Sequence, residues 1–310
     1  MKKAALPLTE FDWDAEWKRV QKGRSSAYAS AFWDKRAPGF RAKKVSDYER
    51  SFLSFAGIEE GWSVLDVGCG SGTFSLPLAL EGHRITAVDF SQGMLDQLAQ
   101  EAAADGVQDW ITCINGSWDD DWQELGIEPG SVDVALASRS FLTLELAASL
   151  QKLNTAARRR VCLTVGVAAF PFFDVPLFQA IGHEPVAMGD YFLVLGALAS
   201  LGIVAEVRLI GSSKRDVYLD SESAREAALM MLGPVSAEEE QRLERYLDEH
   251  LIPWRLTSAE YEHLQAHRVY RDLRVPASAQ TDTAEAEHRG VAKDYLRDTR
   301  WAFISWDVTA

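Results

Sequence analysis

The sequence predicts an α/β fold built on a doubly wound, mainly parallel sheet. Between residues 63 and 167, short apolar segments that suit buried strands alternate with segments of helical spacing. The first apolar segment ends in a loop with glycines at Gly68, Gly70 and Gly72, and the second ends in Asp89. Strands that alternate with helices form parallel sheets with helices on both faces.

The elements follow one another in short order along the chain. Ser46 suits the N-cap of a helix that reaches Ala56 and leads into the first strand, with Glu49 at capping-box spacing. Strands are expected at 63–67, 84–88, 110–114, 132–137 and 161–167, with helices at 73–81, 91–104, 119–124 and 143–156. A helix at 191–201, a sixth strand at 203–210 and a last strand at 301–308 follow.

The loop after the first strand carries the strongest functional signal. Residues 64–75 read Val-Leu-Asp-Val-Gly-Cys-Gly-Ser-Gly-Thr-Phe-Ser. Glycine is needed where the backbone adopts a positive φ or lies against a ligand, and the amides of the following helix point at that ligand. A dinucleotide-binding loop places its third glycine three residues after the second, whereas Gly72 comes after two. The segment resembles the glycine-rich motif of the class I S-adenosylmethionine-dependent methyltransferases.

The resemblance continues past the second strand, where Asp-Phe-Ser-Gln-Gly-Met-Leu follows. Asp89 can accept hydrogen bonds from ribose hydroxyls, a role that dehydrogenases and methyltransferases share. In the family, the next residue and the methionine pack on the adenine, which implies Phe90 and Met94 here. Core packing is the alternative role of both side chains.

Two more strand ends complete the site that the resemblance implies. The positions that flank the adenine past the third strand correspond to Ser117 and Trp118, although a tryptophan there equally suits a rim position. Ligands lie at the carboxyl ends of parallel strands, so Ser138, Arg139 and Ser140 are expected to face the cofactor's methionine part or the substrate. The implied cofactor-binding residues are Asp66, Gly68, Cys69, Gly70, Gly72, Asp89, Phe90, Met94, Ser117, Trp118 and Ser138.

Composition narrows the partners and the location. The chain has 310 residues and a net charge of −14, which disfavours nucleic acid as a partner. No apolar run is long enough to span a membrane, and no signal peptide is evident. Three widely spaced cysteines indicate neither a disulfide framework nor a zinc site, so we expect a cytoplasmic protein without a metal. The oligomeric state is left open.

The resemblance also organises the domains. Residues 1–45 are expected to form a helical segment over the cofactor site. Residues 46–211 and 299–310 are expected to form the Rossmann-like methyltransferase core, whose last strand is antiparallel in the family. Residues 212–298, mostly charged and helix-prone, are then a helical insertion or cap.

The sequence indicates the methyl acceptor less specifically than it indicates the cofactor site. The fourth strand ends in Ala-Ser-Arg-Ser, not in the Asn/Asp-Pro-Pro-Tyr/Phe motif of the amino methyltransferases. The candidate substrate-binding residues are Arg36, Arg139, Phe172 and Tyr191. The candidate general bases, none of them decisive, are Asp174, His183, Tyr191, His263, His267 and Tyr270.

Two functions from different classes follow from these observations. The first is an S-adenosylmethionine-dependent methyltransferase that acts on an unidentified small molecule. The alternative is a sensor or interaction module that binds S-adenosylmethionine or S-adenosylhomocysteine without catalysis. A nicotinamide-dependent oxidoreductase is disfavoured by the glycine spacing and by the last strand.

Overall fold

The computed structural model describes residues 11–21, 30–34, 37, 46–167, 174–183, 190–266, 273–276 and 286–308. The chain divides into two compact units. The first unit comprises Met1–Val167, Gly189–Ile210 and Trp301–Ala310, and the second comprises Ala168–Met188 and Gly211–Arg300. Within the described residues, no helix has the length and apolar character needed to cross a membrane.

The sheet of the first unit confirms the predicted fold class. Its strands are β1 (Val64–Val67), β2 (Ile85–Asp89), β3 (Ile111–Asn115), β4 (Val132–Ser138), β5 (Ala157–Gly166), β6 (Glu206–Tyr218) and β10 (Arg297–Asp307), of which β6 and β10 also contribute residues to the second unit. The strand order is β3-β2-β1-β4-β5-β10-β6. Strands β1 to β5 pair in parallel, and β10 pairs antiparallel with β5, from Trp301 opposite Gly166 to Asp307 opposite Arg160.

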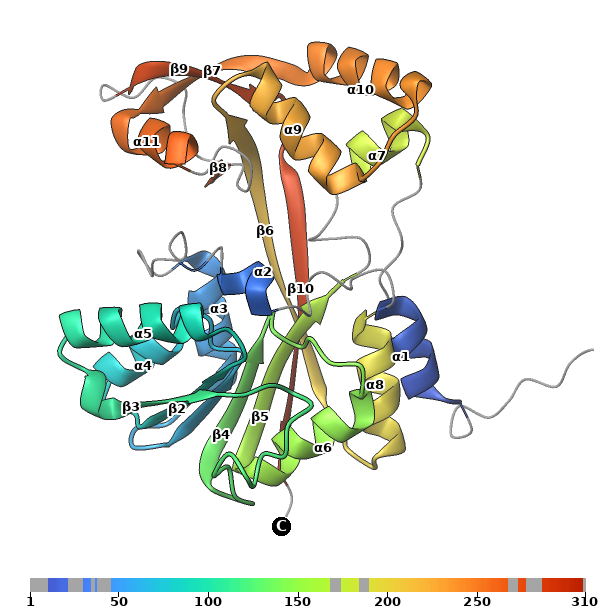
Figure 1. Ribbon diagram of the computed structural model, residues 1–310. Coiled ribbons are helices and arrows are strands. Elements are labelled where there is room, and N and C mark those ends of the chain that lie inside the picture. The colour runs from blue at the N-terminus through green and yellow to red at the C-terminus, as the bar shows by residue number, and fades with distance from the viewer. Residues whose placement is uncertain are drawn as a thin grey trace, which may run out of the picture. The chain divides into compact units, whose positions relative to one another are not determined.

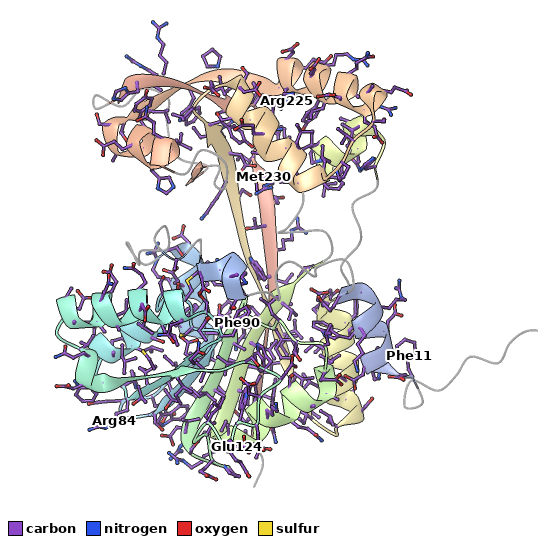
Figure 2. The ribbon with its side chains drawn as sticks, viewed as in Figure 1. Phe11, Arg84, Phe90, Glu124, Arg225 and Met230 are labelled. Atoms are coloured by element: carbon purple, nitrogen blue, oxygen red, sulfur yellow. The ribbon has the colours of Figure 1, made fainter. Side chains whose placement is uncertain are left out.

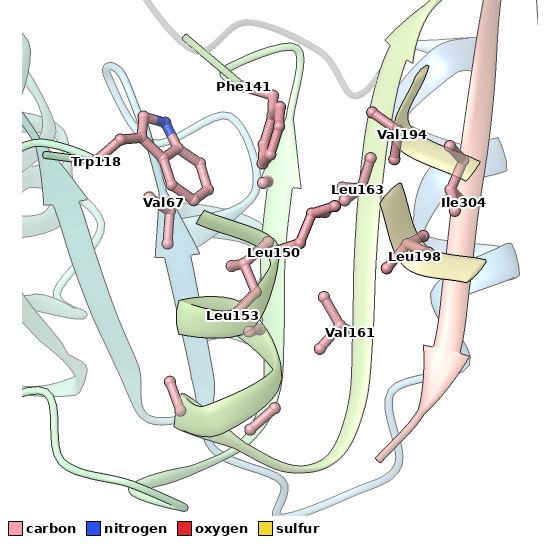
Figure 3. Close-up of a cluster of buried hydrophobic side chains, with 14 of the residues drawn as sticks. Val67, Trp118, Phe141, Leu150, Leu153, Val161, Leu163, Val194, Leu198 and Ile304 are labelled. Atoms are coloured by element: carbon pink, nitrogen blue, oxygen red, sulfur yellow. The ribbon is translucent and has the colours of Figure 1, made fainter. Parts of the chain in front are cut away.

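Helices cover both faces of this sheet (Figure 1). They are α1 (Trp13–Gln21), α2 (Ser30–Asp34), α3 (Asp47–Ala56), α4 (Ser75–Leu80), α5 (Gln92–Ala104), α6 (Leu146–Ala156) and α8 (Asp190–Ser200), with a short 3-10 turn at Gln108–Trp110. Helices α1, α6 and α8 share one core cluster with the sheet, part of which Figure 3 shows, and α3, α4 and α5 share the other. Strand β10 serves both clusters, because Ile304 faces the first and its neighbour Phe303 the second.

Two helix starts match the sequence prediction in detail. Ser46 and Glu49 form the predicted capping box of α3. Ser91 is the N-cap of α5, where its side chain accepts a hydrogen bond from the Met94 amide.

Two local predictions in the first unit differ from the structure. Strand β5, expected at 161–167, begins at Ala157, and its residues Arg158 and Arg159 pair with Asp133. The expected helix at 119–124 is a series of turns. There the Asp120 carboxylate accepts from the Ser117 amide, and such local side-chain bonds compete with helix formation.

The second unit is not wholly helical, which corrects the expectation for 212–298. Besides α7 (Val175–Ile181), α9 (Ser221–Leu232), α10 (Ala237–His250) and α11 (Ser258–Ala266), it contains β7 (Leu251–Thr257), β8 (Leu273–Pro276) and β9 (Ala286–Lys293). Strand β9 lies between β6 and β7 with antiparallel pairing, and β8 pairs with β6. In β7 only Trp254 and Leu256 are buried, a period-2 pattern too short to stand out among charged residues.

Candidate functional site

The glycine loop joins β1 to α4, and each of its glycines has a positive φ: 69° at Gly68, 55° at Gly70 and 91° at Gly72. A Cβ at Gly68 would lie 2.3 Å from Cβ of Ser140, and one at Gly72 would lie 2.4 Å from Cδ1 of Leu98. A Cβ at Gly70 would meet no atom within 4 Å. The outer glycines therefore permit close packing, whereas Gly70 presents bare backbone to open space, as a backbone-bound ligand requires.

Asp89, at the carboxyl end of β2, holds the loop in place. Its Oδ2 accepts a hydrogen bond from the Gly70 amide at 2.8 Å, and its Oδ1 accepts one from the Ser91 amide at 2.9 Å. Burial raises the pKa of this carboxyl, while the two amide bonds oppose that rise. Each carboxylate oxygen has a further lone pair, so Asp89 can still accept hydrogen bonds from ligand hydroxyls.

Asp66 lies beneath the loop rather than at its surface. It is 2% exposed, and it accepts a hydrogen bond from the Ser75 hydroxyl at 2.8 Å. Burial, with a smaller contribution from the charge of Asp89, raises its pKa to about 6. Asp66 therefore joins β1 to the first turn of α4. Cys69, also buried, packs in the core cluster of that face.

Helix α2 contributes a residue that the sequence analysis missed. The Asp34 carboxylate accepts hydrogen bonds from the Ser91 hydroxyl at 2.6 Å and from the Gly93 amide at 3.1 Å. The end of α2 is thereby fixed at the start of α5, close to Asp89. No sequence signal marked Asp34, since its partners are 57 and 59 residues away. The predicted substrate residues Arg36 and Phe172 lie outside the described residues.

Trp118 belongs to a core cluster, where it packs against Phe141 with ring centres 4.9 Å apart (Figure 3). Its indole N–H donates to the Ser140 carbonyl at 2.8 Å, which joins the segment after β3 to the segment after β4. The Ser117 hydroxyl accepts from the Asp119 amide in the adjoining turn. Met94 is buried at the start of α5 and Phe90 is half-buried before it. Cofactor contacts of these four side chains stay predictions.

The end of β4 is held by a network around Tyr48 of α3. The Tyr48 hydroxyl is hydrogen-bonded to the Ser138 hydroxyl at 2.8 Å and to the Thr164 hydroxyl at 2.7 Å. Burial raises the pKa of the phenol. Arg139 donates its amide N–H to the Thr164 hydroxyl at 3.0 Å, and its guanidinium lies 4.2 Å from the Tyr48 ring centre. Sequence reasoning found Ser138 and Arg139 but missed Tyr48 and Thr164, which read as core positions.

The candidate general bases that the structure describes lie in both units of the chain. Tyr191, in α8, packs against Phe192 with ring centres 4.1 Å apart and the ring planes tilted by 34°. In the second unit, His183 pairs with Glu239 at 2.7 Å, and Asp174 accepts a hydrogen bond from the Tyr295 hydroxyl. His263 lies in α11, whereas His267 and Tyr270 lie outside the described residues. Among the side chains that the structure describes, no group of three or more could hold a metal ion.

The chain is similar in sequence and in structure to known proteins. A family model described as a methyltransferase domain matches residues 64–160, from β1 into β5. The malonyl-[acyl-carrier protein] O-methyltransferase of Erwinia billingiae is 30% identical over 176 residues, which cover 52% of this chain and 68% of that protein. An uncharacterized protein of Haemophilus influenzae is 35% identical over 223 residues, covering 70% of this chain and 80% of its own. The structure of magnesium protoporphyrin IX methyltransferase from Synechocystis PCC 6803 is similar over 64% of this chain and 93% of that chain, at 17% identity and a TM-score of 0.42.

Proposed function

The chain belongs to the class I S-adenosylmethionine-dependent methyltransferases, and we propose that its first unit binds S-adenosylmethionine along the edge formed by the glycine loop and Asp89. One observation carries this proposal: Gly70 faces open space while its amide is bonded to the Asp89 carboxylate. In this arrangement the backbone at Gly70 leaves room for the cofactor, and Asp89 accepts hydrogen bonds from the ribose hydroxyls.

The remaining residues of the site have proposed positions around the cofactor. Phe90 and Met94 flank the adenine on one side, and Ser117 and Trp118 line its edge. Ser138, held by Tyr48, lies at the methionine end. When bound, S-adenosylmethionine would supply a sulfonium methyl group, whose bond to sulfur breaks as its bond to the acceptor atom forms, with S-adenosylhomocysteine as the leaving group. The chain's part in such a reaction is to orient the acceptor and to exclude water.

The acceptor is a small molecule, and the net charge of −14 supports this over a nucleic acid. All three cysteines are free thiols, and two of them are buried, which supports a cytoplasmic location where thiols stay reduced.

Thermal unfolding with S-adenosylhomocysteine tests the cofactor assignment. A ligand at about 100 times its Kd stabilises the protein by roughly 2.7 kcal/mol, so we expect the Tm to rise by several degrees, with no rise for NAD. Asp89→Ala should abolish the rise. The matched control is Asp96→Ala, which changes an exposed aspartate on α5 and should leave it intact. No rise in the wild type would refute the assignment.

A further inference from the structure

We propose that Arg139 binds a carboxylate group of the methyl acceptor, an inference that rests on the proposed function. Arg139 directly follows β4, and the next residue, Ser140, packs against Gly68 of the glycine loop. The Ser140 hydroxyl also donates to the Val67 carbonyl at the start of that loop. Arg139 is therefore the immediate chain neighbour of a residue that contacts the loop we assign to the cofactor.

The backbone at Arg139 has an unfavourable conformation that the surroundings maintain. Its φ is 56°, and no other non-glycine residue in the described part of the chain has a positive φ. Such a conformation costs about 1 kcal/mol or more and concentrates at functional sites. The Thr164 hydroxyl accepts the Arg139 amide N–H and so holds the turn in place.

The guanidinium of Arg139 packs on an aromatic ring, and no described carboxylate balances its positive charge. Its central carbon lies 4.2 Å from the centre of the Tyr48 ring, and such a cation–π contact uses none of the N–H groups as a hydrogen-bond donor. No carboxylate among the described residues pairs with it, although acidic residues outnumber basic ones 46 to 32 in the chain. By contrast, Arg158 and Arg160 in neighbouring β5 pair with Asp133 and Asp307.

A carboxylate is the ligand that this arrangement fits. A guanidinium binds a carboxylate with two parallel hydrogen bonds, which adds orientation as well as affinity. A phosphate carries more charge and usually has several cations or backbone amides around it, whereas the Arg139–Tyr48–Thr164 network contains one cation. An acceptor whose carboxylate is bound here would be oriented beside the glycine loop.

Arg84 provides a matched control. It too is an exposed arginine over an aromatic ring, 5.4 Å from the centre of Trp110. It precedes β2, at the end opposite Phe90 and Asp89 (Figure 2). Arg84→Gln therefore removes the same charge and the same kind of stacking away from the proposed site.

The test is thermal unfolding of the protein saturated with S-adenosylhomocysteine, titrated with acetate, benzoate and malonate. Acetamide, benzamide and inorganic phosphate are titrated in parallel. We expect at least one carboxylate to raise the Tm while its amide does not. Arg139→Gln should weaken that response about 10- to 100-fold, as expected for a lost hydrogen-bonded charge pair. Arg84→Gln should respond like the wild type.

Arg139→Lys keeps the charge without the planar fork, so its response should be intermediate. A normal response to S-adenosylhomocysteine shows that each variant is folded. If none of the carboxylates stabilises the wild type, or if Arg139→Gln responds equally, the inference is wrong. An Arg139-dependent response to phosphate alone would also overturn it. Failure of S-adenosylhomocysteine itself to bind would instead refute the proposed function.

Discussion

Single carboxylates organise the candidate site at the residue scale. Asp89 accepts one hydrogen bond from an amide of the glycine loop and one from the amide of Ser91, the N-cap of α5. Asp34, at the end of α2, also accepts a hydrogen bond from Ser91. Asp66 supports the loop from below through Ser75. Burial raises the pKa of Asp89 and of Asp66, and the charges of Asp34 and of Asp89, respectively, add to these rises, so the three carboxylates repel one another.

Asp66 should make the ligand-free protein less stable as the pH rises from about 4 to 6. Its pKa of about 6 in the folded state exceeds the ordinary 3.8, so in this range the folded state binds more protons than the unfolded state. The stability lost is at most about 3 kcal/mol and stays lost above pH 6. Chemical denaturation of the wild type and of Asp66→Asn at several pH values measures it. If the stabilities of the two proteins changed in parallel with pH, the raised pKa of Asp66 would be contradicted.

At the scale of single elements, helix caps and apolar patterns explain which helices and strands could be predicted from the sequence. Strands β1, β2, β4 and the inner part of β5 were predicted to within a few residues, because parallel strands buried on both faces read as continuous apolar runs. Strands β8 and β9 were not predicted, because their antiparallel pairing with distant segments is invisible in local sequence.

The capping box of α3 allows a matched pair of substitutions in one helix. Ser46→Ala should destabilise the protein by about 1 kcal/mol, because the Glu49 amide loses its side-chain partner. Ser54→Ala, at an exposed interior position of α3, should be neutral or stabilising by a few tenths of a kcal/mol, since alanine is the better helix former. Urea denaturation distinguishes them. Equal effects would show that the cap does not stabilise α3.

The network around Tyr48 shows why part of the site escaped sequence analysis. Its partners Ser138 and Thr164 lie 90 and 116 residues along the chain, and only the fold brings them together. The glycine loop and Asp89 could be predicted because their chemistry requires particular residues at a short spacing.

At the scale of the whole molecule, the candidate cofactor-binding residues belong to one unit, and the other unit has a buried core of its own. All eleven predicted cofactor-binding residues lie in the first unit. The second unit has its own buried charges, among them Lys293, which is 3% exposed and pairs with Asp174 at 3.5 Å. Burial lowers the pKa of this lysine, and its amine lies 4.5 Å from the Tyr246 ring centre.

Lys293→Met should therefore separate stability from cofactor binding. Removing one partner of a buried ion pair leaves Asp174 without its cation, so we expect a loss of about 3 kcal/mol in stability. The affinity for S-adenosylhomocysteine should stay unchanged, because the proposed contacts lie in the first unit. Thermal unfolding and isothermal titration measure the two quantities. A loss of affinity in the folded variant would mean that the second unit contributes to cofactor binding.

A comparison of two glycines tests most directly whether the glycine loop binds S-adenosylmethionine. Gly70 and Gly61 both have a positive φ, 55° and 79°, and a Cβ at either would meet no atom within 4 Å. Alanine should thus strain each backbone by a similar amount, about 1 kcal/mol, but only at Gly70 would the methyl group occupy the space assigned to S-adenosylmethionine. Isothermal titration with S-adenosylhomocysteine should show affinity reduced at least about tenfold, or roughly 1.4 kcal/mol, in Gly70→Ala and unchanged in Gly61→Ala. Equal affinity of both variants and the wild type would contradict the assignment of this loop.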